Sequence, residues 1–103
     1  MPEKFRAALD ETVALCRELI ARLAAGQLPD MGQVERFGTL IAAFRPKARF
    51  DPIAGPWFAL SAAETWLRIA IDERDGAAGR ARELTLKQLR LVLSELDELL
   101  GLR

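Results

Sequence analysis

The 103-residue chain carries 15 basic and 15 acidic side chains, so its formal net charge is zero at neutral pH. Half of its residues are apolar and 29% are charged, which is typical of a folded domain and excludes an intrinsically disordered chain. The charge balance also excludes a global electrostatic attraction to nucleic acid or to membranes. We therefore expect a single domain over residues 1–103.

The residue composition favours helix over sheet. Leu and Ala supply 17 residues each, whereas Val, Ile and Thr together supply 12. Leu and Ala lose little conformational freedom in a helix, and β-branched residues fit strands better. Arg outnumbers Lys by 12 to 3, which we interpret as the codon usage of a GC-rich bacterium.

The first predicted helix spans residues 2–25 and ends at Gly26 and Pro29. Apolar side chains recur along it at spacings of three and four, as on the buried face of an amphipathic helix. They are Phe5, Leu9, Val13, Cys16, Ile20 and Leu23. We interpret Cys16 as a small core residue rather than a reactive thiol.

The second predicted helix begins after Asp30 and ends before Pro46. Asp30 and Gln33 are spaced as a variant of the capping box, which satisfies amide groups that the first turn leaves free. Its apolar stripe comprises Val34, Phe37, Leu40, Ile41 and Phe44.

The segment 44–58 holds three of the five prolines and four of the seven aromatic residues. We interpret it as a Pro/aromatic-rich loop between the second and third helices, with Phe50, Ile53 and Trp57 plugging the open end of the core. Basic residues alternate along this loop, and alternate residues of an extended segment share one side. Arg45, Lys47 and Arg49 are therefore candidate contacts for an anion such as phosphate.

The third predicted helix has two candidate starts, either Pro56 as a first-turn proline or a capping box of Ser61 and Glu64. We favour the early start, because one stripe then continues through the helix. This stripe comprises Trp57, Leu60, Leu67 and Ile71.

The fourth predicted helix follows a break marked by Gly76 and Gly79. It begins either near Ala78 or later, with Thr85 and Gln88 as its cap. Its two apolar rows are Leu89, Val92, Leu96 and Leu99, and Leu86, Leu93 and Leu100. Four amphipathic helices with short connections predict an all-α, up-and-down four-helix bundle.

A bundle helix needs apolar residues at about three positions in seven. The third and fourth predicted helices have apolar residues at more positions than this. Such helices are either enclosed by the others in a monomer or shared with a partner. We favour a partner, with a two-fold homodimer as the commonest symmetry and the helix of a partner protein as a further occupant. The candidate interface residues are Trp57, Phe58, Trp66, Leu91 and Leu93.

The chemistry-bearing residues indicate no catalytic, metal or cofactor site. The chain has no histidine, so neither Ser nor Thr has the usual activating base. The carboxylate pairs Asp72/Asp75 and Glu95/Glu98 have the spacing of metal ligands, but they belong at opposite ends of two antiparallel helices. We therefore expect no enzyme and no cofactor.

Two functions remain from this reading of the sequence. The first is a non-enzymatic, self-associating interaction protein, which acts as an adaptor, small chaperone or regulatory subunit. The alternative is a small nucleic-acid-associated regulator that contacts phosphates through Arg45, Lys47 and Arg49. Because no apolar run reaches the length of a signal peptide or a membrane span, we expect a cytoplasmic protein without membrane contact.

Overall fold

The computed structural model describes residues 3–43, 45, 54–72, 77–99 and 101. These residues form four helices and no strand. The helices are α1 (Glu3–Ala24), α2 (Met31–Ala43), α3 (Ala54–Asp72) and α4 (Ala77–Leu99). The prediction of an all-α chain with four helices is confirmed.

The early alternative is the correct one for both helices whose start was ambiguous. α3 begins at Ala54, which places Pro56 in the first turn, where its missing N–H costs no hydrogen bond. α4 begins at Ala77, so Thr85 lies well inside the helix. The Thr85 hydroxyl donates a hydrogen bond of 2.7 Å to the carbonyl of Ala81 in the preceding turn and does not cap a helix.

Local hydrogen bonds fix the turn between α1 and α2. The Gln33 amide donates to Asp30 Oδ1 over 2.9 Å, and the Asp30 amide donates to Gln33 Oε1 over 3.3 Å, which confirms the capping box. At the end of α1, the Gln27 amide donates to the carbonyl of Arg22 over 2.8 Å. With Gly26 at a φ of 80°, this is the Schellman ending of a helix.

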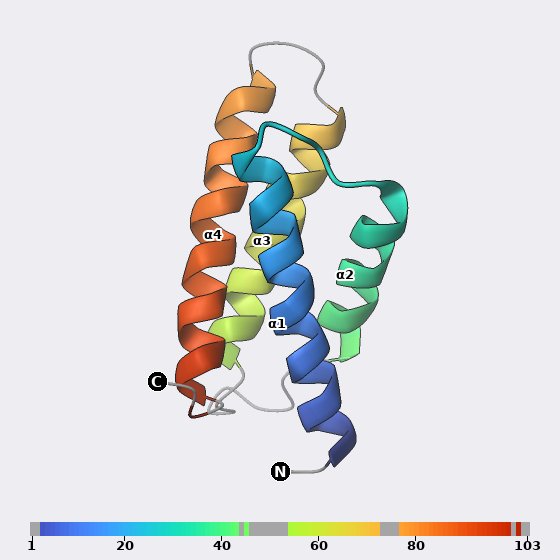
Figure 1. Cartoon of the computed structure of the whole chain (residues 1–103), viewed down its shortest axis with the longest axis vertical. Coiled ribbons are helices and arrows are strands. Elements are labelled where there is room, and N and C mark those ends of the chain that lie inside the picture. Colours follow the sequence, from blue (N-terminus) through green and yellow to red (C-terminus); the bar gives the residue numbers. More distant parts are fainter. Residues whose placement is uncertain (1–2, 44, 46–53, 73–76, 100, 102–103) are drawn as a thin grey trace.

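Successive helices run in opposite directions, and the molecule measures 43 × 24 × 23 Å (Figure 1). α3 and α4 share the most extensive contact, and α4 also packs on α1. α2 contacts α3 and α1 less extensively, and the diagonal pairs do not meet within the described residues. The four helices therefore form a ring in chain order, which indicates a bundle.

The core is a single cluster to which all four helices contribute. Leu9 and Leu19 of α1, Phe37 of α2, Leu67 of α3 and Leu96 of α4 are fully buried within it. Two polar residues, Thr12 and Thr85, are also fully buried. Each satisfies its hydroxyl by donating to a carbonyl four residues earlier in its own helix, so neither leaves an unpaired donor.

The predicted core position of Cys16 is confirmed, because its side chain is fully buried. Burial in apolar surroundings raises the pKa of the Cys16 thiol to about 12. The thiolate, which is the reactive form, is therefore strongly disfavoured in the folded protein.

The predicted plug of the core falls largely outside the described residues, since Phe50 and Ile53 belong to the range 46–53. Trp57 is described, and its indole N–H donates a hydrogen bond of 2.9 Å to the carbonyl of Ile41 in α2. No helix in the described ranges has the length and hydropathy needed to cross a bilayer.

Candidate interaction surface

The side of α3 that faces away from the core is also apolar. The buried positions of α3 are Pro56, Ala59, Leu60, Ala63, Leu67 and Ala70. Phe58, Ala62, Trp66 and Ile69 follow one another at spacings of four, four and three, which places them together on another side. Phe58 is 65% exposed, and the other three are half-buried.

These side chains are not part of the core packing. Seven partly buried apolar residues pack against the core cluster, and Trp66 and Ile69 are not among them. A half-exposed tryptophan and isoleucine beside an exposed phenylalanine form a coherent apolar surface rather than scattered single residues.

α4 presents a matching apolar row to the same side. Leu84 and Leu91 lie seven residues apart, with Gln88 between them and Glu95 one turn beyond. Leu91 is 47% exposed, and Leu84 is half-buried without packing against the core cluster. Both leucines therefore lie outside the two rows that α4 turns inward.

A close contact between α3 and α4 shows which side of each helix faces the other. Glu95 Oε2 lies 3.5 Å from the position that a Cβ would take at Gly55 in the first turn of α3. This oxygen is buried and has no hydrogen-bond partner among the described residues, and its negative charge is favourable beside the positive end of the α3 dipole. Gly55 precedes Phe58 by three residues, so the row of Glu95 adjoins the row of Phe58.

Because α3 and α4 are antiparallel, the Gly55–Glu95 contact sets the level of the remaining residues (Figure 1). Phe58 comes near the level of Leu91, and Trp66 comes near the level of Leu84. This register places the apolar residues of the two helices next to one another, and we call them the α3–α4 strip. It consists of Phe58, Ala62, Trp66, Ile69, Leu84 and Leu91.

The five interface residues expected from the sequence divide between two environments. Phe58, Trp66 and Leu91 belong to the strip. Trp57 and Leu93 instead pack against the core cluster. A helical pattern shows that a residue is apolar and off the main stripe, but which neighbour covers it depends on the packing of the other helices. We therefore leave Trp57 and Leu93 out of the strip.

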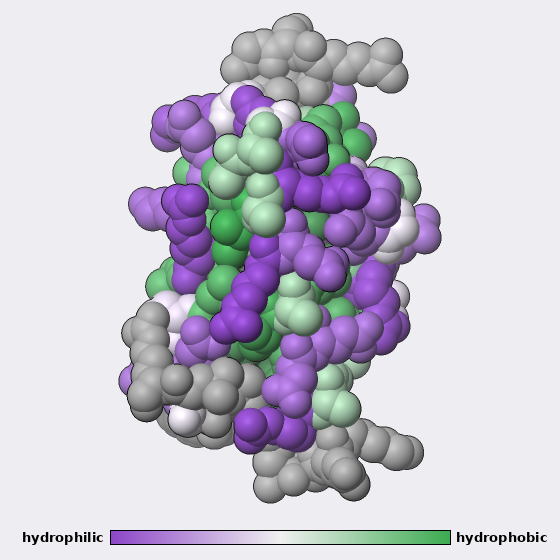
Figure 2. All heavy atoms as spheres, in the orientation of Figure 1, coloured by the Kyte–Doolittle hydropathy of each residue, from purple (hydrophilic) through white to green (hydrophobic). Residues whose placement is uncertain are grey.

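The opposite side of the molecule has a different character. Figure 2 shows the face on which α1 lies in front of α3, where hydrophilic side chains cover much of the surface and apolar ones appear mainly between them. Two exposed apolar side chains lie at the turn from α1 to α2, Leu28 at 45% and Met31 at 53%. They are not continuous with the strip.

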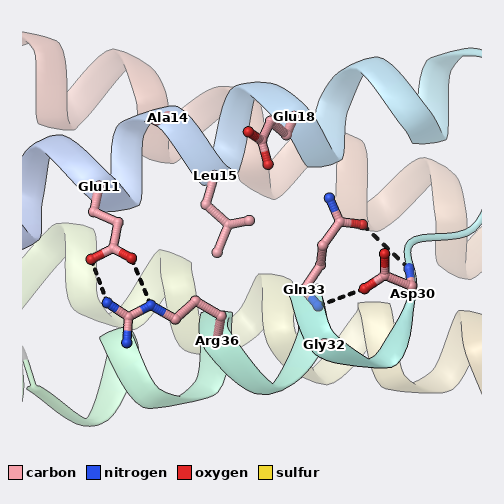
Figure 3. A pocket seen from close by; sticks show the side chains of 8 residues that line it. All are labelled: Glu11, Ala14, Leu15, Glu18, Asp30, Gly32, Gln33 and Arg36. Carbon is pink, nitrogen blue, oxygen red and sulfur yellow. Dashed lines mark hydrogen bonds and ion pairs between the residues drawn. The ribbon is translucent and has the colours of Figure 1, made fainter.

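A hollow of about 370 Å³ lies between α1 and α2 (Figure 3). Ala14 and Leu15 of α1 and Gly32 of α2 line it with small or apolar groups. Its polar side chains largely bond to one another. Gln33 and Asp30 are occupied by the capping box, and Arg36 is occupied by Glu11. The hollow therefore offers few free polar groups to a ligand.

Glu11 and Arg36 form a two-pronged ion pair that joins α1 to α2 (Figure 3). The Arg36 Nε–H donates to Glu11 Oε1 over 2.6 Å, and a second bond joins Arg36 Nη2 to Glu11 Oε2. Hydrogen bonding to Arg36 lowers the pKa of Glu11, and the bond to Glu11 raises the pKa of Arg36. Sequence patterns did not predict this pair, because 25 residues separate its members.

The candidate anion contacts are only partly described. Arg45 is exposed, whereas Lys47 and Arg49 lie outside the described residues. Two other arginines, Arg36 and Arg82, are engaged within the protein. Arg36 pairs with Glu11, and Arg82 donates to the Gly26 carbonyl over 3.4 Å.

Within the described ranges, no group of three or more His, Cys, Asp or Glu residues is arranged to hold a metal ion. Asp72 and the pair Glu95 and Glu98 lie at opposite ends of the antiparallel helices α3 and α4 (Figure 1). Asp75, the second member of the other pair, lies outside the described residues.

No protein-family model, curated protein or solved structure matches the chain.

Proposed function

We propose that this protein is a non-enzymatic interaction protein that self-associates through the α3–α4 strip. The observation that carries the proposal is the strip itself, in which Phe58 and Leu91 are 65% and 47% exposed. In this proposal the up-and-down bundle is a scaffold that holds the strip rigid, and the pair of chains serves as an adaptor, small chaperone or regulatory subunit.

The mechanism is the burial of apolar surface without chemistry. Each Å² of apolar surface removed from water contributes about 25 cal/mol, and large aromatic groups contribute most to protein interfaces. Phe58 and Trp66 are two such groups, and both are held by the backbone of one helix. Because a rigid helix loses little further freedom on binding, the entropic cost of association is small.

The proposal is tested by the solution mass of the protein and of two variants. We expect light scattering at micromolar concentration to show a dimer, and we expect Trp66→Glu and Leu91→Glu to reduce it to a monomer that remains helical by circular dichroism. Each substitution places a charge in the centre of an apolar interface, which is strongly unfavourable without a partner charge.

Leu28→Glu is the matched control for Leu91→Glu. Leu28 is 45% exposed, nearly the same as Leu91, but it lies outside the strip at the turn between α1 and α2. We expect this variant to keep the mass of the unmodified protein. If the unmodified protein is monomeric by light scattering at every micromolar concentration, the proposal is wrong. Equal dissociation of the Leu28 and Leu91 variants would show that the interface is elsewhere.

The competing hypothesis of nucleic-acid binding is tested separately. Phosphate contacts make affinity fall steeply with salt, so any binding is strongest at low salt. Our proposal predicts no detectable affinity for a random DNA duplex at low salt. Salt-sensitive binding that Arg45→Glu weakens would support the alternative instead.

A further inference from the structure

The charged residues of α4 are segregated by sign, with a basic first part and an acidic last part. In the range 77–90, the four bases Arg80, Arg82, Lys87 and Arg90 against the single acid Glu83 give a net charge of +3. In the range 91–99, the three acids Glu95, Asp97 and Glu98 without a base give −3.

This separation is unfavourable for the helix by itself. The N-terminal end of a helix carries a partial positive charge and the C-terminal end a partial negative charge, so acids are favoured at the start and bases at the end. α4 has no acid in its first turn and no base in its last turn. Its charges therefore oppose its own dipole.

Contacts within the protein offset only part of the separation. Arg82 donates to the Gly26 carbonyl, and Asp97 Oδ1 lies 3.8 Å from Arg17 Nη2 of α1. Arg80, Lys87 and Glu98 are exposed, and none forms an ion pair within the described part of the chain.

Lys87 and Glu98, which form no ion pair with any described residue, lie in the same row as the apolar residues of the strip. Leu84, Lys87, Leu91, Ser94 and Glu98 follow at alternating spacings of three and four, which is the seam of a helix that packs along another helix. In this row Leu91 is central, a base lies one turn before it, and an acid lies two turns after it.

We infer that the occupant of the α3–α4 strip is a second copy of this chain, with its α4 antiparallel to the first and the two-fold axis level with Val92 and Leu93, midway between Lys87 and Glu98. This inference rests on the proposed self-association and adds the direction in which the second copy packs. Antiparallel packing places the basic half of each α4 against the acidic half of the other, and Lys87 comes near Glu98 of the second copy twice by symmetry. The dipoles of two antiparallel α4 helices also attract each other.

A parallel arrangement lacks these advantages. It places like charges side by side along the whole of α4, which suppresses association. The apolar row alone does not distinguish the two directions, because leucine packs equally well in both. The charge pattern is therefore what selects the antiparallel dimer.

Charge reversals at Lys87 and Glu98 test the direction of the partner. We expect Lys87→Glu and Glu98→Lys each to raise the dimer dissociation constant about tenfold, because each replaces two attractive pairs by two repulsive ones. The double variant restores both pairs, so its dissociation constant returns to within about twofold of the original value. Sedimentation equilibrium at low salt measures all four proteins.

Two features make the result unambiguous. Glu98→Lys places a base in the last turn of α4, which favours the helix dipole, so weaker association cannot come from a weakened monomer. Glu35→Lys and Arg45→Glu are the controls, because they make the same charge changes at exposed positions outside the strip, one in α2 and one just after it. We expect both variants to keep the dissociation constant of the unmodified protein.

The outcomes separate this inference from the proposed function. If the protein dimerises but the single reversals leave the dissociation constant unchanged, or the double variant is weaker than either, the antiparallel arrangement is wrong and self-association stands. If the unmodified protein is monomeric, both are wrong.

Discussion

At the scale of single residues, Cys16 shows how burial alone decides reactivity. The side chain is fully buried, and burial raises the pKa of the thiol to about 12. A thiol of this kind offers almost no thiolate at neutral or mildly alkaline pH, and no reagent can reach it without local opening.

We therefore predict that Cys16 does not react with a thiol reagent at about pH 8 in the folded protein and reacts fully in denaturant. The absorbance of the released chromophore measures the reaction. Ala42→Cys provides the comparison, because position 42 is exposed on α2 and its thiol should react at once in the same sample. Rapid reaction of a single equivalent in the unmodified folded protein would contradict the burial of Cys16.

Two glycines should respond in opposite directions to the same substitution. Gly26 has a φ of 80° and completes the Schellman ending of α1, whereas Gly79 lies in the first turn of α4 with open space where a Cβ would be added. We predict that Gly26→Ala lowers the free energy of unfolding by about 1–2 kcal/mol, because an L-residue is strained at positive φ.

Gly79→Ala is the counterpart and should raise the free energy of unfolding by up to about 1 kcal/mol, since alanine loses less backbone entropy on folding. Urea unfolding measures both variants. A loss of stability in Gly79→Ala would show that the added methyl group meets an obstacle. No change in Gly26→Ala would show that the turn does not require a left-handed residue.

At the scale of helices, the Glu11–Arg36 pair joins α1 to α2, which have less extensive contact than α3 and α4. The pair lowers the pKa of Glu11 below its usual 4.5 in the folded state. The unfolded state therefore binds more protons between the folded and the unfolded pKa. The contribution of this pair to stability is complete above the unfolded pKa and is lost as pH falls through the folded pKa.

We predict that Glu11→Gln lowers stability at neutral pH and has a smaller effect at an acidic pH below the lowered pKa of Glu11, where the carboxylate of the original protein is protonated. Urea unfolding at the two pH values measures the difference. Asp10→Asn removes an exposed ion pair within α1 (3.6 Å from Arg6) and is the control for a general charge effect. An equal effect of Glu11→Gln at both pH values would show that the pair does not stabilise the fold.

Helix ends were predictable where the determinants are local. The capping box of Asp30 and Gln33 is confirmed because its two members are three residues apart and meet whenever the helix forms. The early start of α3 follows similarly from Pro56. The Glu11–Arg36 pair, in contrast, requires α1 and α2 to be packed at a particular angle, and no periodic pattern encodes this angle.

At the scale of the whole molecule, self-association should appear in thermal stability. A dimer that forms only from folded chains is stabilised by mass action, so its unfolding midpoint rises with protein concentration. We predict this rise between about 5 and 500 μM, measured by circular dichroism in cells of different path length. Leu91→Glu should abolish the dependence. A midpoint that stays constant over this range would contradict the dimer.

The sequence by itself determined the all-α class, the four helices, the capping box of Asp30 and Gln33 and the core position of Cys16. These features depend on the composition, on the spacing of apolar residues and on contacts within a few residues, all of which can be read along the chain. It also indicated that the third and fourth helices carry surplus apolar surface.

Only the tertiary structure decided which of those apolar residues remain outside the core. Trp57 and Leu93 pack against the core cluster, while Phe58 and Leu91 remain exposed. All four are large apolar residues on the same two helices, and the rings of Trp57 and Phe58 even pack edge to face at 5.3 Å between centroids, yet their exposure differs. The angular position of a residue on its helix is a local property, but the helix that packs there is a property of the whole bundle.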